Sequence, residues 1–385
     1  MKLEAVAGED PRGVLRCLRA AIHGAGPALG LGMVEPAPRA VPAGTAVVVT
    51  TSGSTGVPKS VVLSRNALTA SAIATTARIG EGDWLLALPA SYVAGLQVLV
   101  RAIVSGREPA LLSGAFTPQA FAAASLTMAS THHGERIATY TSLVPAQLSK
   151  LLDAAEHETV VTAALRSFEA ILVGGQALPA ATLERAQAAG ARIVRTYGST
   201  ETSGGCVYDG VPLDGVGLRT IEGEVQITGP TLADGYLDDP DRTAAAFPRD
   251  SDGTRWYRTG DAGIVAGGVL QVRGRLDNVI VSGGINVSLD RVEQIVRGIP
   301  GLSSAVVVAV PDERWGEASV VVATRGEALR RSEADKLDSA RDAVAAVIGP
   351  HARPTRLVLV DEIATLASGK PDREAIRRAV RDLTS

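Results

Sequence analysis

Residues 51–59, with the sequence TSGSTGVPK, have the composition of a loop that holds a polyphosphate. Hydroxyl and backbone N–H groups donate hydrogen bonds, the glycines add no bulk, and Lys59 supplies a cation at the rim. A Walker-type P-loop is excluded, because that motif ends in Gly-Lys-Ser/Thr and here the lysine follows Pro58. A flexible linker of glycine and serine is the simpler alternative, but the Pro58-Lys59 pair and the apolar flanks argue against it.

A second group of chemically capable residues lies at 197–202, with the sequence YGSTET. The ring of Tyr197 offers a face on which adenine can stack, and Thr200 can donate a hydrogen bond to a phosphate. Glu201 is an oxygen ligand suited to Mg²⁺, which proteins hold through few carboxylates together with substrate phosphates. Taken alone, the same residues also fit a polar turn with a solvated glutamate.

Four further segments carry residues that could act on a nucleotide. Asp261 ends residues 257–261 (YRTGD), and a carboxylate there can accept from both ribose hydroxyls. Arg275 offers a second ribose contact, although a single arginine is more often a surface charge. Gly174 and Gly175 follow an apolar run and let the backbone approach a flat ligand closely. Lys370 lies between a glycine and a proline, and a functional role for it can be inferred only together with the other motifs.

Alternating strands and helices must position these groups. Between residues 46 and 195, apolar runs alternate with alanine-rich stretches, which predicts an α/β layer with a largely parallel sheet. The predicted strands are 46–50, 60–63, 83–88, 137–141, 170–173 and 192–195, and the predicted helices are 11–24, 66–77, 119–129 and 145–155. Residues 25–44 are rich in glycine, proline and alanine and predict an irregular connection.

The pattern changes near residue 206. Short apolar runs between Gly and Asp turns predict a small antiparallel sheet or barrel. After Arg275, a small α+β domain with its own core is expected. Its predicted strands are 279–281, 304–310, 320–323 and 356–360, with one helix entered at Ser288 and another at 333–347.

The composition limits the classes of partner. The 385 residues suit two or three domains, and the 3% aromatic content predicts a core of Ala, Val, Leu and Ile. A net charge of -3 without a basic block speaks against nucleic acid. Cys17, Cys206 and the five histidines fit neither a disulfide framework nor a metal site. No apolar run suits a membrane span and no signal peptide is evident, so a cytoplasmic protein is expected, with homo-oligomerisation left open.

From about residue 44 to residue 373, the motifs resemble in order and spacing those of the adenylate-forming enzymes, which include acyl-CoA ligases, adenylation domains and luciferases. The resemblance implies an N-terminal domain over 1–276, built of layered α/β subdomains and a distorted antiparallel barrel. It also implies a small mobile α+β domain over 277–385, with a hinge at Asp277. The reactants that it implies are ATP with Mg²⁺, a carboxylic acid and CoA.

The resemblance also implies a role for each matching residue. The phosphate loop would hold the β- and γ-phosphates through Thr51, Ser52, Gly53, Ser54, Thr55, Gly56 and Lys59. The adenine would be bordered by Gly174, Gly175, Gln176, Tyr197 and Gly198. Thr200 would contact the α-phosphate and Glu201 the Mg²⁺, while Asp261 and Arg275 would hold the ribose. Lys370 would be the catalytic lysine of adenylation, and the pantetheine tunnel would be lined by Ser282, Gly283 and Gly284.

Residues 204–215 (GGCVYDGVPLDG) and 141–148 (TSLVPAQL) resemble, more narrowly, the o-succinylbenzoate–CoA ligases of menaquinone biosynthesis in their short actinobacterial form. The candidate residues for the acid are Tyr92, Thr141, Ser142, Gly204, Gly205, Val207 and Tyr208. Two features depart from the wider family. Tyr92 stands where many relatives carry a histidine, and the phosphate loop begins at residue 51, so a reduced N-terminal region is expected.

Other functions remain open on the sequence. The activated acid could be another aryl or fatty acid, delivered to CoA or to a carrier protein. A non-catalytic ATP-binding protein on the same fold is a different class of function, and the presence of Lys370, Glu201 and Asp261 argues against it. No feature favours a luciferase-like oxygenase.

Overall fold

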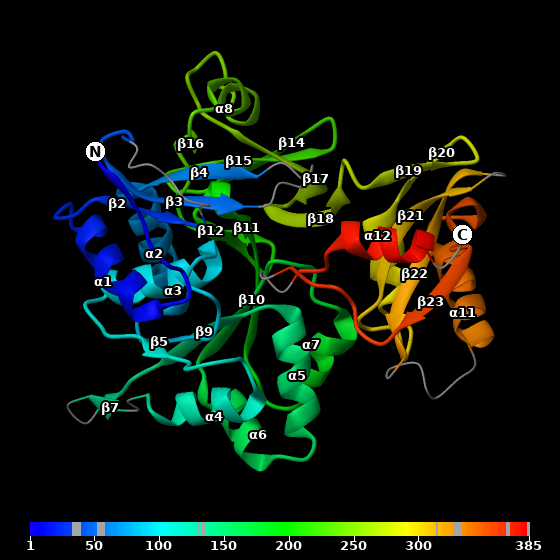
Figure 1. Ribbon diagram of the computed structural model, residues 1–385, viewed down its shortest axis with the longest axis horizontal. Helices are drawn as coiled ribbons and strands as arrows, with labels where there is room; N and C mark the ends of the chain where they lie inside the picture. The colour runs from blue at the N-terminus through cyan, green and yellow to red at the C-terminus, as the bar shows by residue number, and fades with distance from the viewer. Residues whose placement is uncertain are drawn as a thin grey trace.

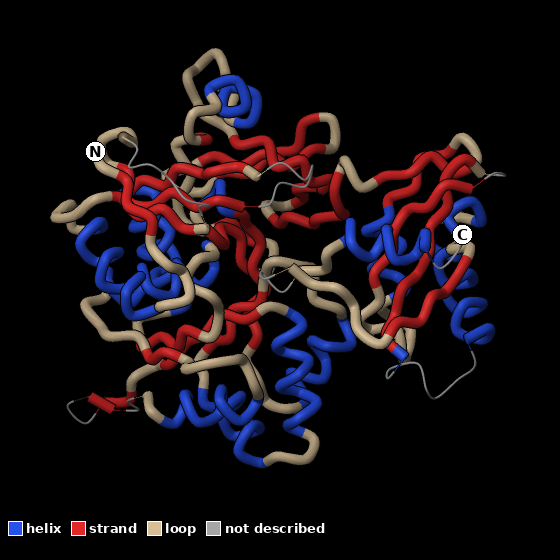
Figure 2. The backbone as a smooth tube through the Cα atoms, viewed as in Figure 1, coloured by secondary structure: helices blue, strands red, loops and turns tan. Residues whose placement is uncertain are grey.

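The computed structural model describes residues 1–32, 40–51, 58–128, 131–132, 135–312, 315–325, 333–366 and 370–382. A large body carries the N-terminus, and a smaller sheet with its helices lies beside it and carries the C-terminus (Figure 1). Figure 2 shows that strands fill the interior of both parts while most helices lie on the outside. The expected arrangement of a large N-terminal and a small C-terminal domain is confirmed.

The first sheet of the large domain carries the phosphate-loop segment between two of its strands. Its order is β1 (Leu3–Ala5), β2 (Ala28–Leu31), β3 (Thr45–Thr51), β4 (Lys59–Ser64) and β16 (Gly235–Tyr236). Strands β3 and β4 are antiparallel, and Thr51 pairs with Lys59 at their open end. The prediction that residues 51–59 join two strands is therefore confirmed.

The expectation of an irregular connection at 25–44 is wrong in one part. Residues Ala28–Leu31 form β2, a fully buried strand that pairs in parallel with both β1 and β3. The four-residue run ALGL is too short to be recognised as a strand among the surrounding glycines and prolines. Its burial between two strands, rather than its local sequence, stabilises it as a strand.

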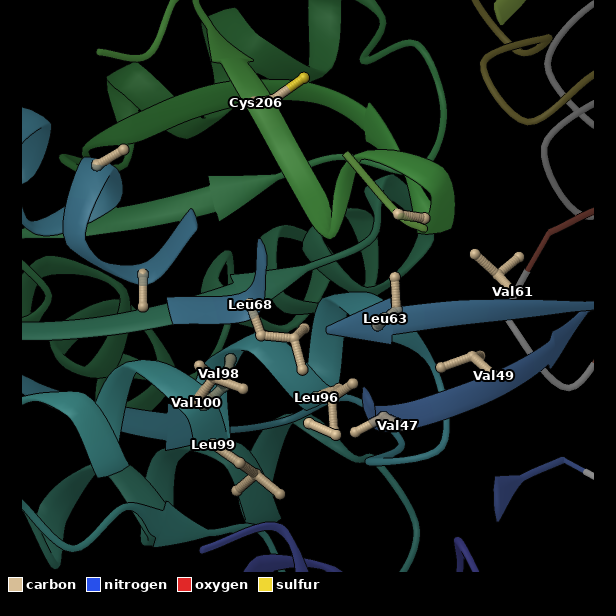
Figure 3. Packing of buried hydrophobic residues seen from close by; sticks show 14 of the residues in the cluster. Val47, Val49, Val61, Leu63, Leu68, Leu96, Val98, Leu99, Val100 and Cys206 are labelled. Carbon is tan, nitrogen blue, oxygen red and sulfur yellow. The ribbon is translucent and has the colours of Figure 1, made fainter. Parts of the chain in front are cut away.

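Helices α1 (Pro11–Ile22) and α2 (Arg65–Ile79) pack against this first sheet, and α3 (Val93–Val104) packs against both helices and against strands of the second sheet. Alternate residues of β3 and β4 point to these helices, and Figure 3 shows Val47, Val49, Val61 and Leu63 in one cluster with Leu68 and Leu96. As expected from the few aromatic residues, this core consists mainly of Val, Leu and Ala. The sequence did not predict α3, which is buried along most of its length.

The second sheet provides the predicted parallel layer. Its order is β13 (Val211–Pro212), β12 (Gly204–Tyr208), β11 (Ile193–Ser199), β10 (Ala170–Val173), β9 (Thr139–Leu143), β5 (Asp83–Leu86) and β6 (Ala110–Leu111). Strands β6, β5, β9, β10 and β11 are parallel, whereas β12 and β13 are antiparallel. The flanking helices are α4 (Pro118–Leu126), α5 (Pro145–Ala155), α6 (Thr159–Ser167) and α7 (Ala180–Ala188). A small ribbon of β7 (Thr131–His132) and β8 (Glu135–Arg136) stands apart.

The small antiparallel sheet that was expected after residue 206 has four strands. They are β14 (Gly217–Ile221), β15 (Glu224–Thr228), β17 (Tyr257–Ala266) and β18 (Val269–Arg275), with helix α8 (Pro240–Ala246) between β16 and β17. Asp261 of β17 pairs with Arg275 of β18, and a register shift interrupts the pairing of these strands between Ala262 and Gly263. The two candidate ribose residues are therefore cross-strand neighbours.

The C-terminal domain has a five-stranded sheet of its own. Its strands are β19 (Val279–Ser282), β20 (Ile285–Ser288), β21 (Val306–Asp312), β22 (Gly316–Thr324) and β23 (Arg356–Val360). The helices are α9 (Leu289–Val296), α11 (Glu333–Val347) and α12 (Arg373–Asp382), with a short 3₁₀ turn, η2 (Pro350–Ala352), between α11 and β23. A second 3₁₀ turn, η1 (Thr200–Thr202), follows β11 in the large domain. Ser288 caps α9 as expected, through a bond from the N–H of Arg291.

Candidate active site

A buried glutamate lies where the first and second sheets meet. Glu201 is only 2% exposed, and its Oε1 accepts hydrogen bonds from Lys59 Nζ and, at 3.0 Å, from the hydroxyl of Tyr236. Burial favours the neutral carboxyl, but the charge and hydrogen bond of Lys59 outweigh it, so the pKa of Glu201 lies below its ordinary value. The carboxylate is therefore ionised at neutral pH, as a metal ligand must be.

A tight turn after β11 presents this glutamate. The hydroxyl of Thr202 accepts from the N–H of Ser199 at 2.9 Å and donates to Gly204 O at 2.7 Å, which closes η1. Gly198 has no room for a side chain, because an added Cβ would lie 2.1 Å from Gly204 O. The glycine lets β11 and β12 approach closely, so Glu201 lies directly at the end of the sheet.

A chain of hydrogen bonds joins the candidate adenine and ribose residues. The hydroxyl of Tyr197 donates to Asp261 Oδ2 at 2.6 Å, and Arg275 Nη1 donates to Asp261 Oδ1 at 3.2 Å. Burial raises the pKa of Asp261 in spite of these two donors, and burial beside Asp261 raises the pKa of Tyr197 well above its ordinary value. Tyr197, Asp261 and Arg275 are thus gathered in one place, as the sequence predicted.

Lys370 reaches this cluster from the C-terminal domain. A Cβ added to Gly175, whose φ is +81°, would lie 3.8 Å from Lys370 Cε, so the lysine stem lies over the glycine turn after β10. The residue as a whole is exposed, yet the protein around its amine lowers its pKa through desolvation, against the opposing charges of Asp261 and Glu201. Figure 1 shows the segment before α12 extending from the small domain to the centre of the large one.

Of the other candidate nucleotide-binding residues, some lie within the described part of the chain and some outside it. Gly174 approaches Thr196 so closely that a Cβ would lie 2.3 Å from Thr196 Oγ1, and Gln176 follows at the same turn. Thr200 is half-buried in η1 beside Glu201, and Thr51 Oγ1 is buried without a hydrogen-bond partner among the described residues. The remaining loop residues, Ser52, Gly53, Ser54, Thr55 and Gly56, lie outside the described part of the chain.

The candidate pantetheine residues do not lie with this cluster. Gly283 and Gly284, with φ of +58° and +82°, form the turn of the β19–β20 hairpin, and Ser282 precedes it. Positive φ at both turn residues is the requirement that glycine meets best. In Figure 1 the hairpin lies at the far side of the small domain from β11.

The candidate acid-binding residues are mostly buried. Thr141 and Ser142 lie in the middle of β9, and Thr141 Oγ1 donates to Leu85 O at 3.0 Å. Val207 and Tyr208 belong to the hydrophobic core, whereas Gly205 is half-buried. Strands β10 and β11 separate β9 from β12, so these candidates do not form one cluster.

Helix α3 lies against the other part of the candidate acid site. Tyr92 precedes the helix as its N-cap residue, and a Cβ added to Gly204 would lie 3.1 Å from Gln97 Cγ and 3.9 Å from Val93 Cγ2. Gly204 therefore faces α3 directly, and a Cβ at this position would require Gln97 to shift by a few tenths of an ångström.

Sequence reasoning missed Arg101 of α3, which is only 4% exposed. Its Nη2 donates to the hydroxyl of Tyr208 at 3.3 Å, and its guanidinium lies 4.7 Å from the ring centre of Trp84. Its Nε has no hydrogen-bond partner within the described ranges. The available signal was a single arginine inside the apolar run 96–104, which is unusual because buried arginines normally have a partner.

Comparisons with known proteins agree with this geometry. The model of the AMP-binding enzyme family matches residues 7–221, and the model of the AMP-binding enzyme C-terminal domain matches residues 291–370. A probable 2-succinylbenzoate–CoA ligase of Mycobacterium tuberculosis is 40% identical over 338 residues, which cover 86% of this chain and 84% of that protein.

Two solved structures share the fold. Escherichia coli MenE with bound OSB-AMS superimposes with a TM-score of 0.69 at 25% identity, over 90% of this chain and 72% of that one. The o-succinylbenzoate CoA synthetase of Bacillus subtilis, in complex with the acyl-adenylate intermediate OSB-AMP, gives a TM-score of 0.71 over 94% and 80% of the two chains. Its identity of 22% supports a common fold alone.

Proposed function

This chain belongs to the AMP-binding enzyme family, and from that premise we propose that it is an ATP-dependent acid–thiol ligase that activates o-succinylbenzoate and transfers it to CoA. The observation that supports it most is the 40% identity to a 2-succinylbenzoate–CoA ligase over most of both chains. The cluster of Lys370, Glu201 and Asp261 supports the adenylating chemistry independently of that name.

In the first half-reaction, a carboxylate oxygen of the acid attacks the α-phosphate of ATP and pyrophosphate leaves. Both reactants are anions, so the protein contributes mainly by holding them in line and by placing positive charge where negative charge develops. Lys370 is positioned for this task above Gly175, and Lys59 stands at the base of the phosphate loop. Asp261 and Arg275 orient the ribose from neighbouring strands.

The residues present fit a Mg²⁺ ion bound with the triphosphate. Glu201 offers an ionised carboxylate, and Thr51 Oγ1 nearby lacks a partner among the described residues. No group of three or more His, Cys, Asp and Glu side chains forms a complete metal site in the described ranges, so substrate phosphates would supply the other ligands. The ion would neutralise phosphate charge, while Lys59 would exchange Glu201 for a phosphate oxygen.

In the second half-reaction, the CoA thiolate attacks the acyl carbonyl, the bond to AMP breaks, and AMP leaves as an anion. We propose that the C-terminal domain rotates about Asp277 between the steps. Lys370 then leaves the site, and the turn formed by Ser282, Gly283 and Gly284 approaches it to line the path of the pantetheine.

The acid keeps a second carboxylate that does not react, and we propose that Arg101 attracts it. Arg101 is a buried cation without a paired carboxylate among the described residues, and it contacts Tyr208 in a segment that was expected to line the acid site. An unpaired buried charge is costly, so a ligand that compensates it gains affinity. Replacement by Lys or Met should raise the KM for the acid more than the KM for ATP.

Pyrophosphate release tests the reaction and the substrate together. The assay compares o-succinylbenzoate with benzoate, a fatty acid and no acid, each with ATP and Mg²⁺ and each with or without CoA. We expect strong turnover only with o-succinylbenzoate and CoA. Turnover with another acid would support the proposed reaction but contradict the proposed substrate. ATP binding without any turnover would support a non-catalytic protein.

In the described part of the chain, no helix is long and apolar enough to span a membrane.

A further inference from the structure

We propose that Asp290 is a positioning residue that holds the C-terminal domain in the orientation that places Lys370 over the adenylate site. This inference rests on the proposed function, because it concerns the half-reaction that this orientation serves. Asp290 lies in the first turn of α9, within the C-terminal domain. Its side chain is 22% exposed and contacts groups on both sides of the proposed hinge, Asp277.

The two oxygens of the Asp290 carboxylate have different partners. Oδ2 accepts from the backbone N–H of Arg275 at 2.7 Å, whereas Oδ1 accepts from Asn278 Nδ2 at 2.6 Å and lies 3.5 Å from Arg373 Nη2. Gly274 makes the close approach possible, because an added Cβ would lie 2.7 Å from Asp290 Cβ. A single carboxylate therefore connects the end of β18 with the start of α12.

Only one of these contacts must change when the domain rotates. Arg275 is attached to the large domain, since its Nη1 donates to Thr259 O at 2.9 Å and to Asp261 at 3.2 Å. Arg373 belongs to the small domain, where it donates to Val307 O at 2.8 Å and pairs with Glu293 at 2.8 Å. Rotation about Asp277 moves Asp290 and Arg373 together and breaks the contact with the Arg275 N–H.

The same carboxylate is linked to the catalytic lysine. Arg373 follows Lys370 by three residues and opens α12, so fixing Arg373 against α9 fixes the base of the segment that carries Lys370. While Asp290 also binds the Arg275 N–H, that segment is held against the large domain, with Lys370 Cε over Gly175. The contact therefore favours adenylation and opposes the change to thioester formation.

Separate assays of the two half-reactions test the role. Asp290→Ala removes the acceptors, and we expect adenylation to fall about 10- to 100-fold, the range that corresponds to a hydrogen bond to a charged group. Thioester formation from supplied acyl-adenylate should stay unchanged or rise. Asp290→Asn keeps one acceptor oxygen and should give an intermediate loss, while Arg291→Ala, at the exposed next residue of α9, should change neither step.

A measurement without substrates separates this proposal from the proposed function. Donor and acceptor dyes on Glu184→Cys and Gln294→Cys, both exposed and one in each domain, report the domain orientation in a Cys17→Ser background. With Asp290 and Arg291 intact, the dye pair gives the energy-transfer efficiency of the orientation described above. We expect Asp290→Ala to lower the population with this efficiency, and Arg291→Ala to leave it unchanged. An unchanged distribution in Asp290→Ala, or equal losses in both half-reactions, would overturn the proposal even if another acid proved to be the substrate.

Discussion

Lys370 is an exposed lysine whose amine nevertheless lies among charged groups of another domain. If it stabilises the charge that develops on the α-phosphate, Lys370→Ala should lower the adenylation rate about 10²–10³-fold, as for other transition-state donors. Thioester formation from supplied acyl-adenylate should remain near the wild-type rate. Isotope exchange between pyrophosphate and ATP measures the first effect, and adenylation at the wild-type rate would contradict this role.

The pH dependence of adenylation should report the protonation of the Lys370 amine. Desolvation lowers the pKa of Lys370. The alkaline limb of the pH–rate profile of adenylation should therefore have its midpoint below the ordinary lysine pKa of about 10.4. Because the protonated form is the active one, kcat/KM for ATP should fall as pH rises through this pKa. Lys370→Arg should remove the limb, since a guanidinium stays protonated over this range. A limb that persists in Lys370→Arg would belong to another group.

At the scale of elements, the segment between β18 and β19 carries the proposed hinge. Asp277 accepts from Arg275 Nε and Nη2, both at 3.0 Å, which raises the pKa of the arginine. Proline has a fixed φ, so Asp277→Pro should restrict the rotation, lower thioester formation and leave adenylation largely intact. Asp277→Ala is the control, because it removes the same carboxylate while the backbone stays free. Equal loss of both half-reactions in Asp277→Pro would argue against a hinge.

The elements also show which parts of the structure could be predicted from the sequence. Long apolar runs gave β3, β4, β10 and the C-terminal strands, because such runs depend little on tertiary context. Short or fully buried elements such as β2 and α3 were missed, since their residues lack the alternation of a surface element. Their positions depend on the neighbours that cover them.

At the scale of the site, motif residues gathered as predicted while the acid-binding candidates did not. Tyr197, Asp261 and Arg275 lie within β11, β17 and β18. The pairing of β17 with β18 and the bond from Tyr197 to Asp261 bring them together. The direction of a side chain such as Tyr208, which points into the core toward Arg101 and Thr75, depends on pairings between residues over a hundred positions apart. Sequence patterns carry little information on such pairings.

At the scale of the whole molecule, the two domains have separate hydrophobic cores. The largest core in the N-terminal domain and the core around α9 and β22 share no residue. Leu302 is fully buried in the second, so Leu302→Ala should destabilise the C-terminal domain by about 2–5 kcal/mol. Calorimetry should then show an early transition of the small domain and a later one at the wild-type temperature. A common shift of the entire transition would mean that the domains unfold together.

Cys206 lies between Gly205 and Val207, in the segment that we expect beside the activated acyl group, and its thiol is completely buried. Burial raises its pKa to about 12, so only about 10⁻⁵ of it is thiolate at pH 7. Any nearby thiolate can attack the acyl carbonyl of an acyl-adenylate, so a reactive cysteine here would itself be acylated. Because the sulfur is protonated and covered, we expect the protein to escape acylation by its own intermediate and to leave the acyl group to an incoming thiol.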